Sequence, residues 1–339
     1  MIGGNMKTKV TITEIAEKAG VSTATVSRIL NQKGLVKPST QKKVLQAMEE
    51  LQYDTALLSA SVSCRLILVF IPDFANPFYA KIIDGIQQAA HENNFEIFLV
   101  QVKEIYSNYT YFSNLVSNGN FSGVIWLCTV PPIELLTTID RICPTVMCCE
   151  YPENYDTTYV SIDDVSAAYK AVNYLISTGC SRIGMINCSS KYKYARHRKQ
   201  GFMDALQDAG LEYHPEWIIN IPYIDYTLAY SSILQLLSSS ERPDAFFTCS
   251  DVFAAAAISA AHSFGIKVPD ELSVIGFDNV ETSRITSPTI TTISQPAFHM
   301  GQHACAMLIE KILSGRNMPN RHLLLDTEFI IRESTKTFM

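Results

Sequence analysis

The chain has 339 residues, of which 47% are hydrophobic, and a formal net charge of −6. This length is enough for two or three domains with substantial cores. No apolar run approaches the roughly 18 residues that a membrane-spanning helix needs, and the polar N-terminus lacks the apolar segment of a secretory signal. The composition therefore argues against a membrane protein and indicates a cytoplasmic one.

Positive charge is concentrated near the N-terminus. Residues 1–53 hold eight basic and four acidic residues, whereas residues 54–339 hold 19 basic and 29 acidic residues. A basic segment on an otherwise acidic chain indicates contact with phosphate groups at one end only.

Two short helices are expected at the start of the chain. Apolar residues fall at helical spacing over residues 12–19, and Gly20 then breaks the run. Thr11 and Glu14 have the spacing of a capping box at the first helix. Ser22 is a good N-cap for a second helix after the glycine.

The second helix has one apolar face, made of Val26, Ile29 and Leu30. Its other face carries small side chains and one arginine, Arg28. Two short helices joined by a glycine-containing turn form a helix-turn-helix. A helix-turn-helix commonly binds DNA by placing its second helix in the major groove. Small side chains on the leading face suit this placement, because a bulky face would keep the helix out of the groove.

A third helix is expected from Ser39 or Thr40 to about Tyr53. Its apolar face, which would pack on the first two helices, consists of Val44, Leu45, Met48 and Leu51. The three helices predict a small all-α domain over residues 7–53. Residues 54–65 contain no glycine and few large side chains, which is typical of a linker.

Apolar strands and helices alternate from residue 66 to the end. Strands are expected at 66–71, 95–102, 124–128, 145–149, 159–162, 183–187, 217–221, 245–248, 272–276, 289–293 and 322–331. Helices are expected at 77–93, 109–118, after Pro132, at 165–178, through 201–209, and at 227–238, 252–264 and 298–313. This alternation predicts an α/β body with parallel sheets covered on both faces.

About ten strands are too many for one comfortable sheet, so we expect two βα lobes with a cleft between them. The first lobe is expected to contain residues 66–160 and 292–322, and the second lobe residues 161–291 and 323–339. In such folds ligands bind beyond the carboxyl ends of the strands. Binding residues are therefore expected in the loops that follow strands.

Nine cysteines are scattered among apolar runs, and no two of them form a C-x-x-C pair. Buried free thiols in a reducing compartment explain this pattern best. We expect no metal site and no cofactor. The chain also lacks a G-x-S-x-G motif and a phosphate loop, which argues against an enzyme.

The run T-I-T-E-I-A-E-K-A-G-V-S-T-A-T-V-S-R-I-L-N (11–31) is followed by a series of shorter motifs. These are P-D-F-A-N-P-F-Y (72–79), S-I-D-D (161–164), R-H-R-K-Q-G-F (196–202), C-S-D (249–251), V-P-D-E-L-S-V-I-G-F-D-N (268–279) and T-T-I-S-Q-P (291–296). In them the chain resembles the lactose-repressor (LacI) family across residues 9–335. The resemblance implies lobes of the type I periplasmic-binding-protein kind and a homodimer on near-palindromic operator DNA. It also implies a small effector in the cleft that changes operator affinity.

The resemblance implies a set of DNA contacts. Thr23 and Ala24 match the helix tip that contacts base edges, and Leu57, Leu58 or Val62 stands where relatives insert a wedge into the minor groove. The residues expected to contact DNA are Thr11, Ser22, Thr23, Ala24, Ser27, Arg28, Asn31, Lys37, Leu57 and Leu58.

The resemblance also implies an effector site. Arg198 matches an arginine that clamps the effector, and Asp278 matches an aspartate that accepts its hydroxyl groups. Cys149, with Glu150 beside it, stands where many relatives have a cleft aspartate. The residues expected to contact a sugar or nucleoside are Asp73, Phe78, Tyr79, Cys149, Glu150, Arg198, Tyr223, Ser250, Asp251 and Asp278.

We expect the dimer to form through the helix at 77–93 and the alanine-rich helix at 251–264, whose small side chains suit close packing between subunits. One alternative remains, a sugar-binding protein of the periplasmic type. Such a protein would share the lobes but would have a signal peptide and no basic three-helix domain.

Overall fold

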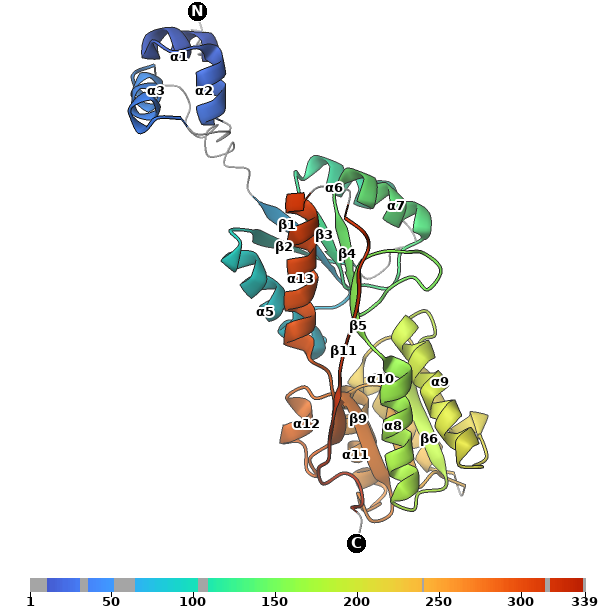
Figure 1. Cartoon of the computed structure of the whole chain (residues 1–339). Coiled ribbons are helices and arrows are strands. Elements are labelled where there is room, and N and C mark those ends of the chain that lie inside the picture. The colour runs from blue at the N-terminus through green and yellow to red at the C-terminus, as the bar shows by residue number, and fades with distance from the viewer. Residues whose placement is uncertain are drawn as a thin grey trace, which may run out of the picture. The chain divides into compact units, whose positions relative to one another are not determined.

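The computed structural model describes residues 11–30, 36–51, 65–102, 109–239, 241–314 and 318–337. It divides into two compact units, Met1–Arg65 and Leu66–Met339, which are shown in Figure 1. The division falls where the expected linker ends. Of the residues expected to contact DNA, Asn31, Leu57 and Leu58 lie outside the described residues, as do Val62 and most of the linker.

The N-terminal unit contains α1 (Ile12–Ala19), α2 (Thr23–Leu30) and α3 (Pro38–Glu50). The expected capping box is confirmed, because the Thr11 side chain accepts from the Glu14 amide and the Glu14 carboxylate accepts from Thr11. The Ser22 hydroxyl accepts from the Thr25 amide at the start of α2. The third helix starts one residue before the predicted Ser39, because proline suits the first helical position.

A small core holds the three helices together. Ile15, Ala16, Val26, Val44 and Met48 are buried in it. Two side chains assigned to the apolar faces are instead exposed, Ile12 at 40% and Leu45 at 47%. Only the stripe of each helix that faces the other two helices is buried.

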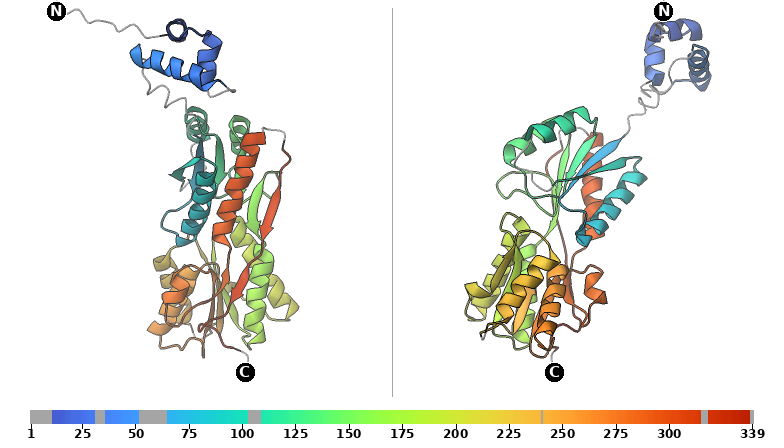
Figure 2. Two further views of the ribbon diagram at one scale, coloured as in Figure 1. Left: turned by 60° about the vertical axis from the view of Figure 1, so that its left-hand side comes forward. Right: turned by 180° about the vertical axis from the view of Figure 1, so that it is seen from behind.

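The C-terminal unit consists of two lobes, each a six-stranded sheet between two layers of helices (Figures 1 and 2). The sheet of the first lobe has the spatial order β11 (His322–Leu325), β5 (Tyr159–Ile162), β4 (Thr145–Cys148), β3 (Gly123–Trp126), β1 (Leu66–Ile71) and β2 (Glu96–Gln101). One face packs against α5 (Pro77–Glu92) and α13 (Ala297–Ser314), and the other against α6 (Tyr109–Asn118) and α7 (Ile133–Ile142). A Cβ on Gly85 or Gly301 would collide with the opposing helix backbone, so these two glycines allow α5 and α13 to pack closely.

The sheet of the second lobe has the order β12 (Glu328–Ile330), β10 (Thr291–Ser294), β9 (Ser273–Asp278), β8 (Ala245–Thr248), β6 (Ile183–Cys188) and β7 (Ile218–Ile221). One face packs against α8 (Asp164–Ser177) and α9 (Lys193–Asp208), and the other against α10 (Tyr226–Leu237) and α11 (Asp251–Ser263). A short 3-10 helix (Pro215–Trp217) precedes β7, and α12 (Thr282–Ile285) follows β9. All strand pairs in both sheets are parallel except β10 with β12.

Two details differ from the sequence-based expectation. The single strand expected at 322–331 is divided, since β11 joins the first sheet and β12 the second. β5 also belongs to the first sheet and β10 to the second. The chain therefore passes from one lobe to the other a few residues later than expected, since the boundaries were expected near 160, 291 and 322. An apolar strand pattern does not show which of two similar sheets a strand joins.

The alanines of the helix α11 are core residues of the second lobe, so they do not form the exposed close-packing surface that was expected for a subunit interface. Ala254, Ala256, Ala257, Ala260 and Ala261 are all fully buried within the chain itself. Small side chains therefore serve close packing of this helix on its own sheet.

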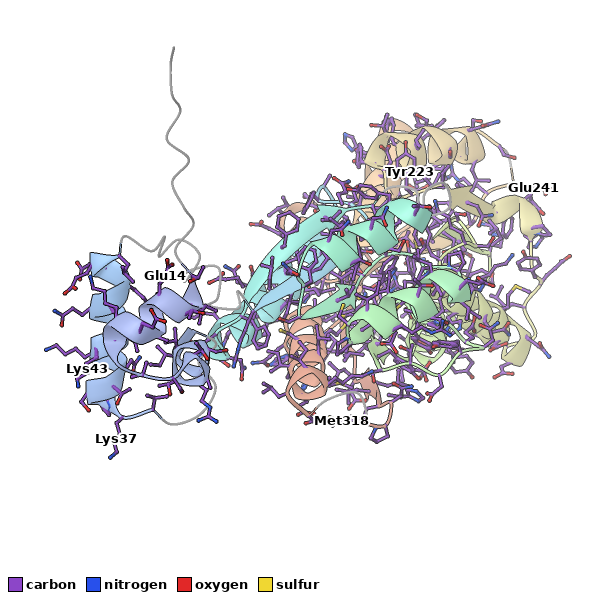
Figure 3. All side chains as sticks on the ribbon, turned by 90° about the horizontal axis from the view of Figure 1, so that it is seen from above. Glu14, Lys37, Lys43, Tyr223, Glu241 and Met318 are labelled. Atoms are coloured by element: carbon purple, nitrogen blue, oxygen red, sulfur yellow. The ribbon has the colours of Figure 1, made fainter. Side chains whose placement is uncertain are left out.

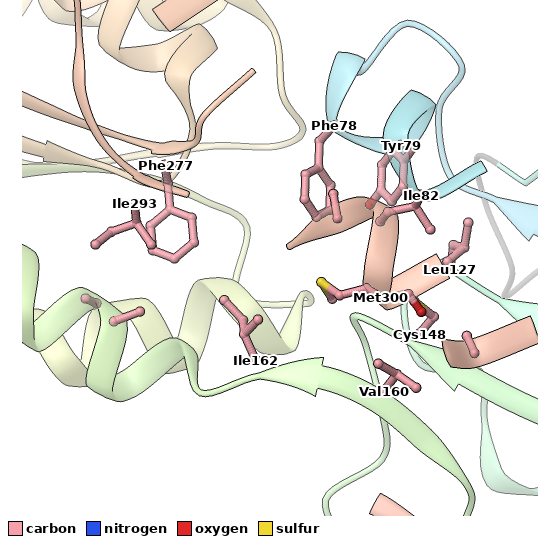
Figure 4. Close-up of a cluster of buried hydrophobic side chains, with 14 of the residues drawn as sticks. Phe78, Tyr79, Ile82, Leu127, Cys148, Val160, Ile162, Phe277, Ile293 and Met300 are labelled. Carbon is pink, nitrogen blue, oxygen red and sulfur yellow. The ribbon is translucent and has the colours of Figure 1, made fainter. Parts of the chain in front are cut away.

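One hydrophobic cluster continues from lobe to lobe. It includes Phe78 and Ile82 of the first lobe and Phe277 and Ile293 of the second, with Ile162 between them (Figure 4). None of the described helices is both long and apolar enough to span a membrane. Each of the described cysteines has a free thiol, and all but Cys149 are buried.

Candidate functional site

The carboxyl ends of strands from both sheets border a cleft between the lobes. Its lining consists of Asn76, Phe78, Tyr79, Cys149, Glu150, Ser161, Ile162, Asp164, Tyr194, Arg198, Ile224, Cys249, Asp278 and Gln295. The free volume of this cavity is about 30 Å³. A single water needs roughly 10–15 Å³ by the same measure, so a ligand of sugar size enters only when the walls of the cleft move apart.

Arg198, on α9, is the central cation of the cleft, and only 4% of its surface is exposed. Its Nε donates to Asp164 at 2.9 Å and its Nη1 donates to the Cys249 carbonyl at 2.7 Å. The guanidinium lies 3.4 Å from the centre of the Phe277 ring. A planar cation fixed on an aromatic face is held ready to bind the polar edge of a ligand.

Asp278, the last residue of β9, lies beside Arg198 on the second-lobe wall of the cleft, with 3.8 Å between the carboxylate and Nη1. Its backbone has a φ of 104°, which few residues other than glycine adopt. Gln295 donates to the carboxylate at 2.7 Å. Burial raises the pKa of Asp278 to about 7, although Arg198 and Gln295 oppose the rise.

This raised pKa predicts a pH dependence of stability. An aspartate in the unfolded chain has a pKa of about 4, so between pH 4 and 7 the folded chain holds a proton that the unfolded chain has lost. Raising the pH through this window therefore lowers the free energy of unfolding, by up to about 1.4 kcal/mol per pH unit, with no further loss above it.

The measurement compares the wild type with Asp278→Asn, which does not titrate. Both tryptophans, Trp126 and Trp217, belong to the C-terminal unit, so their fluorescence during urea unfolding reports on that unit. We expect the difference in stability between the two proteins to change from pH 4 to 7. A difference that does not vary with pH would contradict the assignment.

The cleft brings together six of the ten residues expected to contact an effector: Phe78, Tyr79, Cys149, Glu150, Arg198 and Asp278. The other four lie elsewhere. Tyr223 is 51% exposed on the surface (Figure 3), and Asp73 accepts from the Ala75 amide in its own loop. Ser250 caps the N-terminus of α11.

Asp251 has a structural position. It is fully buried, accepts from the Val280 amide at 2.8 Å, and receives a hydrogen bond from the Thr292 hydroxyl at 2.6 Å. These bonds fix the loop after β9 to the start of α11. The carboxylate that follows β8 therefore supports the cleft without lining it.

Eight further residues line the cleft that were not expected to do so: Asn76, Ser161, Ile162, Asp164, Tyr194, Ile224, Cys249 and Gln295. Most of them lie within or next to motifs on which the family resemblance rests. Ser161 and Asp164 are in S-I-D-D, and Gln295 is in T-T-I-S-Q-P. The polar character of Asn76, Ser161, Asp164 and Gln295 within these motifs is the signal that marks them in the sequence.

In the N-terminal unit, the expected contact face of α2 is open. Ser22, Thr23, Ala24 and Arg28 are exposed and Ser27 is half-buried, while Val26 of the same helix is buried. Thr11 and Lys37 are also exposed, and the Lys37 and Lys43 side chains extend outward from this unit (Figure 3).

Comparison with known proteins matches two segments of the chain to family models. Residues 11–56 match the bacterial regulatory proteins of the lacI family, and residues 172–335 match the periplasmic binding protein-like domain. Among curated proteins, the HTH-type transcriptional repressor CytR of Escherichia coli K12 is 33% identical over 334 residues, covering 97% of both chains. The chain belongs to the lacI family of bacterial regulatory proteins.

Further relatives agree with this family. The HTH-type transcriptional repressor PurR of Histophilus somni (strain 129Pt) is 31% identical, covering 96% of this chain and 99% of the relative. A solved structure of the transcriptional regulator CelR with cellobiose matches at 28% identity and a TM-score of 0.73, covering 96% of this chain and 99% of that chain. In the motifs V-M-C-C-E-Y (146–151), V-N-Y-L (172–175) and I-I-R-E-S-T (330–335) the chain resembles the cytidine repressor more than the purine repressor. The sequence identities, 33% to CytR and 31% to this PurR, have the same order.

Proposed function

We propose that the protein is a sequence-specific DNA-binding regulator, and a repressor, whose affinity for operator DNA depends on a small effector. The exposed face of α2, with small side chains and Arg28 on a basic N-terminal segment, is the observation that carries the DNA function. The family match over residues 11–56 supports it and argues against a solute-binding protein without a DNA function. CytR and PurR, which match almost the whole chain, are named as transcriptional repressors rather than enzymes. Because its partner is operator DNA, we place the protein in the cytoplasm.

Binding to DNA is tested by Arg28→Ala. If Arg28 contacts a base edge, its loss weakens specific binding by about 1–3 kcal/mol. Lys18→Ala is the matched control, because it also removes one positive charge but from an ion pair with Glu50. The probe is a duplex selected from a random-sequence library, titrated at two salt concentrations. Equal affinities for Arg28→Ala and Lys18→Ala would remove Arg28 from the interface.

We propose a sugar or a nucleoside as the effector, without any cofactor. Arg198 and Asp278 offer a donor and an acceptor within hydrogen-bonding reach of one polar ligand, and Phe78 and Tyr79 add aromatic surface. This combination suits an array of hydroxyl groups on a flat ring. The related CelR was solved with cellobiose, which is also a polyhydroxylated ligand.

We further propose a homodimer, because one helix-turn-helix contacts too few base pairs for high affinity. We assign one part of the subunit interface to the exposed face of α5. Since α11 is buried, we assign the second contact to α12, where Ile285 is 74% exposed beside a groove shared with α5. Light scattering at micromolar concentration is expected to give twice the chain mass, and Ile285→Asp to shift the mass toward the single chain. A monomeric wild type would contradict the dimer.

A further inference from the structure

A lysine is buried in the wall of the cleft. Lys193, the first residue of α9, has no exposed surface. Its ammonium donates to the Asp164 carboxylate at 3.0 Å and to the Ser161 hydroxyl at 3.2 Å, and it lies 4.3 Å from the centre of the Tyr151 ring. A carboxylate, a hydroxyl and an aromatic face together form a complete site for an alkylammonium ion.

The same lysine is bound through its backbone by a second buried charge. Glu150 is 2% exposed, and its two carboxylate oxygens accept from the amides of Lys193 and Tyr194 at 2.8 and 3.0 Å. These amides open α9, where a helix offers unsatisfied donors and a partial positive charge. Tyr192, the helix's own N-cap residue, makes no side-chain capping bond.

The contacts of Lys193 with Ser161 and Tyr151, and those of Glu150 with the start of α9, cross from one lobe to the other. Tyr151 and Glu150 follow β4 and Ser161 lies in β5, so these three residues belong to the first lobe. Lys193, on α9, and Asp164, the first residue of α8, belong to the second lobe, so the ion pair between them lies within that lobe. The lysine side chain therefore enters the first lobe, while a first-lobe carboxylate caps the helix that carries the lysine.

We propose that Lys193 is a built-in ligand of the cleft, whose ammonium fills a cation subsite formed by Tyr151, Ser161 and Asp164 and holds the lobes closed without an effector. A buried ammonium tethered to the opposite wall loses far less entropy on binding than a free cation does. Asp164 has both oxygens engaged, one by Lys193 and one by Arg198, so it offers an effector little until the lysine leaves. This inference concerns closure of the cleft and stands independently of the DNA function.

Chemical rescue tests the subsite. Lys193→Ala removes the alkyl chain and ammonium that propylammonium would restore. We expect the variant to melt at a lower temperature than the wild type. Propylammonium chloride is expected to raise the melting temperature of Lys193→Ala more than that of the wild type, because only the variant has an empty subsite. Propanol, of the same shape but uncharged, is expected to produce no such difference.

Hydrogen exchange of the Lys193 and Tyr194 amides tests closure directly. We expect exchange in Lys193→Ala to be faster by about tenfold or more, and to slow again with propylammonium. Lys191→Ala, which removes an exposed lysine two positions earlier, is the matched control and is expected to exchange like the wild type.

If Lys193→Ala does not fold, Lys193→Met keeps the alkyl chain and loses only the charge, and its amides are still expected to exchange faster. Unchanged exchange in either folded variant, or equal effects of propylammonium on Lys193→Ala and the wild type, would overturn the proposal. If Lys193→Ala opens the cleft but still binds operator DNA normally, the proposed function remains intact.

Discussion

Arg198→Ala is expected to lower the free energy of unfolding of the C-terminal unit by about 3–5 kcal/mol, which is the usual effect of removing one partner from a buried ion pair. The substitution leaves Asp164 with Lys193 as its only cation and leaves Asp278 without a facing charge. The Cys249 carbonyl also loses its donor. Because Arg198 is also the proposed donor to the effector, the effector should no longer stabilise this variant.

The matched control for this experiment is Arg196→Ala on the same helix. Arg196 pairs with Glu153 at the surface, where both side chains are at least 43% exposed. Exposed pairs contribute only about 0–1 kcal/mol, so this variant should unfold almost like the wild type. Urea unfolding followed by tryptophan fluorescence measures both. Similar losses in Arg196→Ala and Arg198→Ala would mean that the buried charge network contributes little to stability.

Asp278→Asn is expected to abolish the response to the effector while operator binding without effector stays close to the wild type. The asparagine keeps the shape of the side chain but loses the charge, and hydrogen bonds to a charged partner contribute about 1.5–3 kcal/mol. Coupling between an effector and DNA is typically about 1–3 kcal/mol, so losing the preferred contact is enough to remove it.

A second aspartate provides the control for Asp278→Asn. Asp73→Asn changes a residue that belongs to a neighbouring loop and does not line the cleft, so it should respond like the wild type. Operator binding is measured for each variant with and without a saturating effector. If Asp278→Asn responds normally, Asp278 does not carry the coupling.

Most of the alternation of strands and helices in the described part of the C-terminal unit was predictable, because continuous apolar runs and helical spacing are local properties; the short helix α12 was not expected. The caps of α1 and α2 were predictable for the same reason, since each depends on residues three positions apart. The division of residues 322–331 between two sheets was not, because both strands look alike locally. The burial of α11 also depends on tertiary packing, which alanine content alone does not define.

In the cleft, too, the sequence predicts what local motifs define but not what tertiary packing brings together. Arg198 and Asp278 were assigned through motifs that resemble a known family, and the structure places both in the cleft. Lys193 was overlooked, because nothing in the sequence shows that it meets Ser161 and Asp164, about 30 positions away. A buried lysine is rare unless it is paired, so only its partners in space reveal its importance.

The central claim, that ligand binding in the cleft and operator binding are coupled, is tested most directly by calorimetric titration of the effector with and without operator DNA. The effector is the sugar or nucleoside that most raises the melting temperature of the chain. Reciprocity requires that operator DNA change effector affinity by the same factor by which effector changes operator affinity. We expect a change in effector affinity of about 5- to 150-fold. Equal effector affinities for the free and the DNA-bound protein would contradict it.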